Sequence, residues 1–244
     1  MKHPTSPSSS SSSNKTGQNK KSQQLAAQIF TQLKKAYPHA KCGLNFSNAY
    51  ELLVATILSA QCTDQRVNMV LPELFKYCPD LAHLAQTPLP KIQSLIRSVG
   101  LYQNKAKNLL ALAQALAKQD FKIPRQMDKL IKLPGVGRKT ANVVLSNAWG
   151  LAEGIAVDTH VQRIARILGL SRQQNAPKIE QDLMQLFPRS QWGEISHLII
   201  THGRQVCTAR KPNCPHCPLA KLKLPGCLAR AQQNNKTTKQ QKMR

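Results

Sequence analysis

The stretch L-P-G-V-G-R-K-T-A-N-V-V-L, residues 133–145, joins two segments that have helical periodicity. Pro134 ends the first segment, because its ring cannot continue the hydrogen-bond ladder of a helix. Gly135 and Gly137 permit a positive φ and a close approach by another backbone. Amides in such a turn point outward beside the positive end of the second helix, an arrangement that binds a phosphate without reading any base.

An ordinary tight turn between two helices is the alternative, and G-x-G alone would favour it. The longer pattern continues into Arg138 and has helical segments on both sides, at 125–132 and 138–149. It therefore favours a helix-hairpin-helix element that binds DNA. Lys139, at the start of the second helix, then has two possible tasks: it holds a phosphate, or it attacks a substrate as a nucleophile.

Helical periodicity also covers most of the remaining chain, and no convincing alternating strand is found, so we predict an all-α fold. Asn48 and Glu51 fit a capping pair at the start of one helix. The other expected helices are 23–36, 65–77, 90–98, 103–118, 125–132, 138–149, 159–169, 176–187 and 191–205.

The net charge of +24 is not confined to the ends of the chain. Residues 1–22 and 228–244 carry nine lysines and arginines and no acid, and we expect both tails to be disordered. The rest of the chain still has 26 basic against 11 acidic residues. A polyanion is therefore the expected partner, with nucleic acid favoured over an anionic membrane surface. No membrane span or secretory signal is apparent, so we expect a bacterial cytoplasmic protein.

The seven cysteines are distributed unevenly, because three are scattered and four lie close together near the end of the chain. An odd count with this asymmetry indicates a reducing compartment and one metal site, not a disulfide framework. The clustered four have the spacing C-x6-C-x2-C-x9-C: Cys207, Cys214, Cys217 and Cys227. Four thiolates hold either zinc or a [4Fe–4S] cluster, and spacing alone does not separate them. His216 lies between two of these cysteines, but we expect its side chain to be exposed.

Asp158 directly precedes an amphipathic segment. Aspartate is a common N-cap, and from the residues alone this is the favoured role. A cap also holds the carboxylate rigidly, and the preceding Ala156 and Val157 would give it an apolar wall. A carboxylate in such a place can stabilise positive charge that develops beside it.

Several further motifs accompany the hairpin, in a fixed order along residues 23–227. They are L-S-A-Q-C-T-D-Q-R-V-N (58–68), V-G-L-Y-Q-N-K-A-K-N-L (99–109), L-P-G-V-G-R-K-T-A-N-V-V-L (133–145), A-V-D-T-H-V-Q-R-I (156–164) and the cysteine loop. Together they resemble the endonuclease III family of DNA base-excision glycosylases and lyases, which has a helix-hairpin-helix and an iron–sulfur loop. The last cysteine gap is longer than is usual in that family, by what looks like a four-residue insertion.

The resemblance implies a role for each matching residue. Lys139 matches the lysine that forms a Schiff base with the deoxyribose, and Asp158 matches the catalytic aspartate. Gln61 matches a residue that fills the space left by a flipped base, and Leu101 matches an apolar wedge. We expect basic surroundings and partial burial to favour the neutral amine of Lys139, which is the nucleophilic form.

The remaining matches concern the base pocket, the DNA backbone and the cofactor. Ser59 and Asp64 match residues that line the base pocket. The four clustered cysteines match the ligands of one [4Fe–4S] cluster. The expected DNA contacts are completed by Gly135, Gly137, Arg138 and His160.

Simpler roles remain open for three of these residues. Asp64 is also placed to cap the helix 65–77, Leu101 to make a hydrophobic contact after a helix stop at Gly100, and Gln61 to bond the local backbone.

The resemblance also implies two helical domains with a DNA-binding and catalytic cleft between them. One is a six-helix domain over 44–152, with the hairpin at about 125–149. The other holds the cluster and combines 23–43 with 153–227.

The expected activity is removal of oxidised pyrimidines from duplex DNA, followed by cleavage of the strand at the abasic site, by a monomer. One alternative is a related glycosylase of different base specificity. The other is a non-enzymatic iron–sulfur protein that binds DNA or senses redox state.

Overall fold

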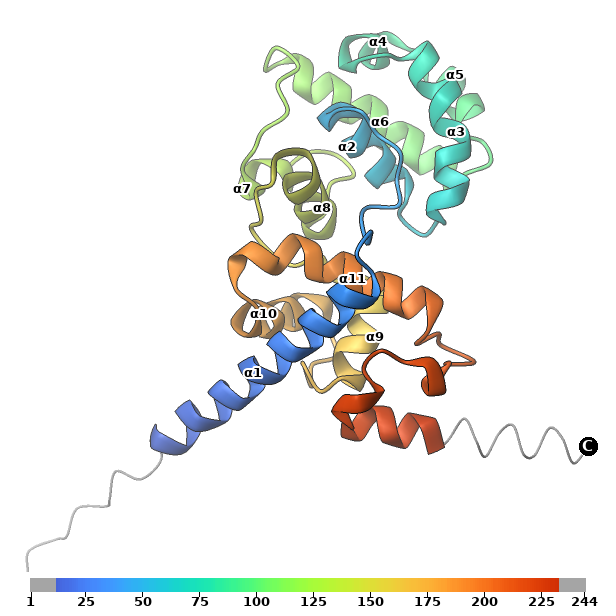
Figure 1. Ribbon diagram of the computed structural model, residues 1–244. Coiled ribbons are helices and arrows are strands. Elements are labelled where there is room, and N and C mark those ends of the chain that lie inside the picture. The colour runs from blue at the N-terminus through green and yellow to red at the C-terminus, as the bar shows by residue number, and fades with distance from the viewer. Residues whose placement is uncertain (1–11, 233–244) are drawn as a thin grey trace, which may run out of the picture. The chain divides into compact units, whose positions relative to one another are not determined.

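The structure is a computed structural model that describes residues 12–232, so residues 1–11 and 233–244 of the two tails lie outside the described part (Figure 1). Within that part every regular element is a helix and no strand occurs, as predicted. The chain divides into two compact units. Unit 2 contains His39–Asp158 and Arg189–His197, and unit 1 contains the chain up to Pro38, Thr159–Pro188 and the chain from Leu198 onward.

Unit 2 contains seven α-helices between residues 44 and 152, where six were expected. The additional one is the six-residue α4, which is too short to give a periodic pattern but is capped by Asp80, whose Oδ1 accepts from the amide of His83 at 2.9 Å. The helices are α2 (Ala49–Leu58), α3 (Asp64–Tyr77), α4 (Leu81–Gln86), α5 (Leu89–Leu95), α6 (Tyr102–Ala117), α7 (Met127–Leu130) and α8 (Arg138–Trp149).

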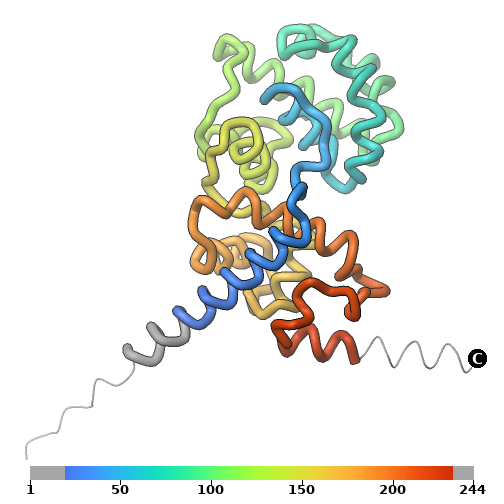
Figure 2. The backbone as a smooth tube through the Cα atoms, in the orientation of Figure 1, coloured from blue at the N-terminus to red at the C-terminus, as the bar shows by residue number. Residues whose placement is uncertain are grey.

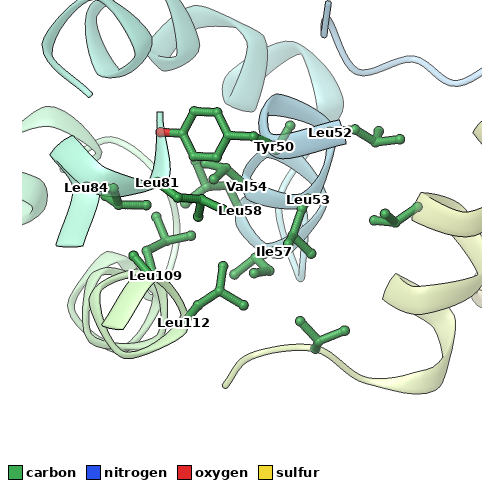
Figure 3. Close-up of a cluster of buried hydrophobic side chains, with 14 of the residues drawn as sticks. Tyr50, Leu52, Leu53, Val54, Ile57, Leu58, Leu81, Leu84, Leu109 and Leu112 are labelled. Carbon is green, nitrogen blue, oxygen red and sulfur yellow. The ribbon is translucent and has the colours of Figure 1, made fainter. Parts of the chain in front are cut away.

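The helix α2 lies at the centre of the unit 2 core, because its sequence is apolar on nearly every face. Figure 3 shows its leucine, isoleucine and valine side chains beside those of α4 and α6. The expected capping pair is confirmed at its start, since the Glu51 amide donates to Asn48 Oδ1 at 2.9 Å. The ring of Tyr50 is buried, and its hydroxyl donates to the carbonyl of Cys78 at 2.7 Å.

Unit 1 is assembled from separate parts of the chain, which appear in Figure 2 as blue, yellow to orange, and red segments. Its elements are α1 (Ser12–Ala36), α9 (Thr159–Ile167), α10 (Ala176–Leu186), the later part of α11 (Trp192–Gln205), the 3-10 turns η2 (Cys214–His216) and η3 (Ala220–Leu222), and a helix at 225–232. α1 packs on α10, and α10 packs on α9.

Two helices extend into segments that were expected to be disordered. α1 begins at Ser12 instead of residue 23, and a helix covers 225–232. The second segment contains Ala, Arg and Gln, which favour helix, and Pro225 occupies a first helical position where proline is well tolerated.

Residues 189–197, which were expected to belong with the cysteine loop, group with unit 2 instead. They comprise the 3-10 turn η1 (Arg189–Gln191) and the first part of α11. His197 Nε2 lies 3.0 Å from Asn147 Oδ1 of α8, and this contact explains the grouping. In the described part of the chain, no helix has the length and apolar character needed to cross a membrane.

Candidate active site

The turn between α7 and α8 requires glycine at residue 135. Gly135 has φ 75°, and a Cβ there would lie 3.0 Å from Cβ of Asn108. Backbone bonds from Leu133 to the Leu130 carbonyl (3.0 Å) and from Val136 to the Leu133 carbonyl (3.1 Å) close the turn. α7 is consequently shorter than the predicted 125–132, because the chain begins to turn after Leu130.

Gly137 does not use the positive φ that glycine permits. It is the N-cap of α8, with φ −89° and ψ 172°, which is ordinary extended backbone. A Cβ at this position would meet no atom within 4 Å. Whatever makes glycine suitable here therefore lies outside the protein's own packing.

The first turn of α8 presents two cations, Arg138 and Lys139, to solvent. Both side chains are exposed, so the partial burial that was expected for Lys139 is absent in the protein alone. The amine is long, accessible and mounted on a helix whose opposite face buries Ala141, Val144 and Leu145 in the core. A rigid helix with an exposed terminal amine can present that group to a large substrate.

Asp158 lies immediately before α9 and is partly buried. The preceding residues Ile155, Ala156 and Val157 are all buried, as the apolar wall required. Asp158 belongs to unit 2, as does Lys139, whereas the helix that it precedes belongs to unit 1. Within unit 2, the carboxylate therefore follows a buried apolar segment.

Gln61 and Leu101 share an unusual backbone conformation. Their φ values are 54° and 58°, in the left-handed region that non-glycine residues seldom occupy. The two loops touch, because a Cβ on Gly100 would lie 3.6 Å from the Gln61 carbonyl oxygen. Both side chains are exposed, Leu101 by 57%. Backbone strain of this kind clusters at functional sites. Here it occurs at two exposed side chains, a leucine and a glutamine, on loops that touch.

The simpler roles for two residues do not hold. Leu101 is too exposed to serve as a packing contact after Gly100. Thr63, not Asp64, caps α3, because its Oγ1 accepts from the Arg66 amide at 3.2 Å.

Asp64 forms part of a polar group within unit 2. Its carboxylate lies against Gly43, where a Cβ would come 2.6 Å from Oδ2. Burial lowers the pKa of His197, and the negative charge of Asp64 partly opposes this effect. Asp64 therefore faces the His197–Asn147 contact. Ser59 lies on a nearby turn and donates from Oγ to the Thr56 carbonyl at 2.8 Å.

Lys105 is a residue of this region that the sequence interpretation missed. Only 5% of it is exposed, and its Nζ donates to the carbonyl of Leu58, the last residue of α2, at 2.8 Å. Burial lowers its pKa, while the Cys62 thiolate acts in the opposite direction. The lysine supports the turn that carries Gln61. Its position in the apolar stripe of α6, four residues before Leu109, is the sequence signal that pointed to burial.

The four clustered cysteines gather in unit 1. Burial, together with the nearby thiolates of Cys217, Cys207 and Cys214, raises the pKa of Cys227 to about 11. Burial likewise raises the pKa of Cys214 and of Cys217. Within the described residues, however, no three His, Cys, Asp or Glu side chains are already arranged around a metal position. His216 is exposed, as expected, and bonds Asn213.

Basic side chains surround the cysteine loop at close range. Arg163 Nη1 donates to the Cys207 carbonyl at 2.6 Å, and Arg230 Nη2 donates to the Thr208 carbonyl at 2.8 Å. His202 is almost fully buried, with its Nδ1 2.9 Å from the Tyr37 hydroxyl. The positive charge of Arg230 acts to lower the pKa of Cys214 and of Cys227, but burial outweighs it, so the pKa of both thiols remains raised.

His160 belongs to unit 1, in the first turn of α9. It packs against α11, where a Cβ on Gly203 would lie 3.2 Å from its Nδ1. It also lines a cavity of about 500 Å³ together with Arg163 and Arg204. The residues of the candidate site thus fall into a unit 2 set around Lys139, Gln61 and Leu101, and a unit 1 set around His160 and the cysteines.

Comparison with known proteins identifies the family. The profile of the HhH-GPD superfamily of base excision DNA repair proteins matches residues 54–189. The chain is 49% identical to endonuclease III of Synechocystis sp. over 200 residues, which cover 82% of this chain and 91% of that protein. The chain belongs to the endonuclease III family.

Two solved structures of endonuclease III with DNA are similar to the whole fold. One is a non-covalent complex and the other is a trapped covalent intermediate with an estranged adenine. Each is 42% identical to this chain, has a TM-score of 0.80, and is matched over 86% of this chain and 98% of its own. Family membership confirms the helix-hairpin-helix fold that residues 133–145 predicted.

Proposed function

We propose that this endonuclease III family member is a bifunctional DNA glycosylase and abasic-site lyase that acts as a monomer on oxidised pyrimidines in duplex DNA. The observation that carries the proposal is the exposed amine of Lys139 in the first turn of α8, directly after the hairpin. A monofunctional glycosylase does not need this lysine, because water can serve as its nucleophile. The similarity to an endonuclease III captured in a covalent intermediate with DNA supports the same role.

Lys139 attacks C1′ of the deoxyribose, and the bond to the damaged base breaks. The imine that results makes the C2′ proton acidic, so its removal expels the 3′ phosphate and cuts the strand by β-elimination. Because Lys139 is exposed in the protein alone, the bound DNA has to exclude water around the amine. The neutral amine is the form that attacks.

Asp158 acts on the charge that appears during this reaction. Positive charge develops on the sugar as the base departs, and a carboxylate fixed before α9 stabilises it without reorganising. The same carboxylate accepts a proton from the attacking amine. Its buried apolar neighbours limit the water that would otherwise weaken the interaction.

A base inside a duplex is inaccessible, so the damaged nucleotide must leave the stack first. We assign the wedge to Leu101, whose exposed side chain enters the vacated stack, and the contact with the orphaned partner base to Gln61. The left-handed backbone at both residues supports this assignment, because strain of this kind persists where the surrounding structure enforces it. Ser59 and Asp64 line the pocket for the flipped base.

We further propose that Cys207, Cys214, Cys217 and Cys227 hold one [4Fe–4S] cluster. The four thiols are partly buried and repel one another when they are ionised, and the positive charge of bound iron would offset this repulsion. The family is also known for such a cluster. When bound, the cluster supplies a structural crosslink of the loop, while Arg163 and Arg230 fix the loop backbone. Analysis of the purified protein should find about four irons and four sulfides per chain; stoichiometric zinc would contradict the assignment.

Gly137 is proposed to lie against a DNA phosphate, together with the outward amides of the hairpin and Arg138. Gly137→Asp should then weaken binding of DNA, because it places a carboxylate beside the phosphate, while base preference changes little. The free energy of unfolding should not fall, because Asp is a good N-cap and open space surrounds this position.

Fluorescence anisotropy with undamaged and abasic duplexes measures this effect, and a melting curve measures stability. The matched control is Gly137→Asn, which caps equally well without charge and should lose less affinity. Unchanged DNA affinity in Gly137→Asp would contradict the proposed contact.

The proposed function is tested by borohydride trapping of the unaltered protein on duplexes with an abasic site, thymine glycol or an undamaged thymine. A covalent product with the first two substrates, and a strand cut 3′ to the lesion, is expected. Binding without trapping or nicking would favour a non-enzymatic DNA-binding or redox-sensing protein. Trapping only on other lesions would indicate a glycosylase of different base specificity.

The endonuclease III relatives from Synechocystis sp., Bacillus subtilis and Escherichia coli are bacterial proteins, and this supports our proposal that the chain acts in a bacterial cytoplasm, on the nucleoid.

A further inference from the structure

A cavity of about 550 Å³ in unit 1 lies outside the proposed catalytic residues. It is lined by α9, by the turn that follows α9 and by the helix at 225–232. No Asp or Glu lines the cavity. Four of its nine lining residues are arginines: Arg163, Arg166, Arg172 and Arg230.

Two of these arginines are fixed by the cysteine loop. Arg163 Nη1 donates to the Cys207 carbonyl at 2.6 Å. Arg230 Nη2 donates to the carbonyls of Thr208 and Ala209, each at 2.8 Å. The Nε of Arg230 is buried and has no hydrogen-bond partner among the described residues, so one donor remains for an acceptor that the protein does not supply.

The other two arginines, Arg166 and Arg172, are exposed. Neither makes a hydrogen bond or an ion pair with any residue that the structure describes. The carboxylate of Asp182 accepts from the hydroxyl of Ser171, one of the lining residues, at 2.6 Å. This carboxylate forms no ion pair with Arg166 or Arg172. Four guanidinium groups around one cavity, with no acid among its lining residues, repel one another and attract an anion.

One wall of the cavity lies at the end of the nine-residue gap between Cys217 and Cys227. The helix at 225–232 begins at the end of that gap and carries Gly226 and Arg230 into the lining. It lies so close to the end of α9 that a Cβ on Gly226 would collide with the Ile167 carbonyl. Arg230 on this helix thereby joins the three arginines on and after α9.

We propose that this arginine cavity binds a phosphate group. Guanidinium groups suit phosphate because they donate paired hydrogen bonds in a planar fork, and Thr159 adds a hydroxyl. The phosphate comes either from the DNA backbone or from a free phosphate compound. Thr159 directly follows the proposed catalytic Asp158, which favours a DNA phosphate near the reacting nucleotide. The proposal does not require glycosylase activity, which borohydride trapping tests separately.

The test compares the unaltered protein with Arg166→Gln/Arg172→Gln and with a control of equal charge, Lys35→Gln/Lys178→Gln. All four side chains are exposed and belong to unit 1, but the two lysines lie on α1 and α10, away from the cavity. Calorimetry measures binding of inorganic pyrophosphate. Anisotropy with an undamaged duplex, measured at several salt concentrations, gives the slope of log K against log salt. Melting curves confirm that all three proteins are folded.

The arginine variant should lose pyrophosphate binding, and its salt slope should be smaller than that of the control by about 0.9, because the one phosphate contact that is lost contributes about that much. Loss of pyrophosphate binding with the slope of the control would support a site for free phosphate compounds. Pyrophosphate binding that the arginine variant retains, an equal loss in the control, or no binding by the unaltered protein would overturn the proposal.

Discussion

Lys139→Gln is expected to abolish borohydride trapping on abasic DNA while the protein still binds that DNA. The amide of glutamine retains much of the length and polarity of lysine but cannot form an imine with C1′ of the sugar. Strand cleavage by β-elimination should be lost with the trapped product, because the imine is what acidifies the C2′ proton. Since the Lys139 side chain is exposed, its replacement should not lower the melting temperature.

The matched control is Lys132→Gln, which removes one exposed lysine a few residues away on the same hairpin. Both variants lose one positive charge, so both should lose similar DNA affinity at low salt. Only Lys139→Gln should lose trapping. If Lys139→Gln is trapped as efficiently as Lys132→Gln, then Lys139 is a phosphate anchor and another group is the nucleophile.

Asp158→Asn is expected to slow base release by about 10²–10³-fold at unchanged melting temperature. The estimate follows from the loss of one fixed group that stabilises charge in a transition state. Asparagine caps a helix about as well as aspartate does, so it preserves the start of α9 and removes only the charge. Single-turnover release of thymine glycol measures the rate, and a thermal melt measures stability.

A second variant separates the two roles of this residue. Asp158→Ala should remove both the charge and the cap, with a stability loss of about 1 kcal/mol in addition to the loss of activity. Full activity in Asp158→Asn, together with lower stability in Asp158→Ala, would mean that Asp158 is only a helix cap.

The residues around the hairpin show how far local sequence reasoning reaches. α8 begins and ends where its sequence predicts, because Gly137, Gly150 and the apolar spacing between them are all local signals. Which of the two glycines takes a positive φ was not predicted, because that depends on the path of the whole turn. Gly135 takes the positive φ and the close contact with Asn108, a residue 27 positions away that sequence spacing cannot place.

The exposure of Lys139 illustrates the same limit. Its type and its place in a motif predicted a nucleophile, but the expected partial burial depends on neighbours that arrive from elsewhere in the fold or from DNA. Lys105 is the converse case, since a lysine in α6 became almost fully buried by donating to the end of α2. A charge is buried only where an acceptor is available, and here the acceptor is a carbonyl of another helix that the sequence of α6 cannot place.

The sequence by itself determined the all-α fold, the hairpin, the cysteine set and the order of motifs that places this chain in its family. These features depend on periodicity, helix signals and spacing, all of which act over a few residues. Only the tertiary structure decided that Gln61 and Leu101 form one strained corner, that Thr63 caps α3 in place of Asp64, and that four arginines surround one cavity. Each of these depends on segments far apart in the chain, which meet only when burial of the apolar core outweighs the entropy of closing the loops between them.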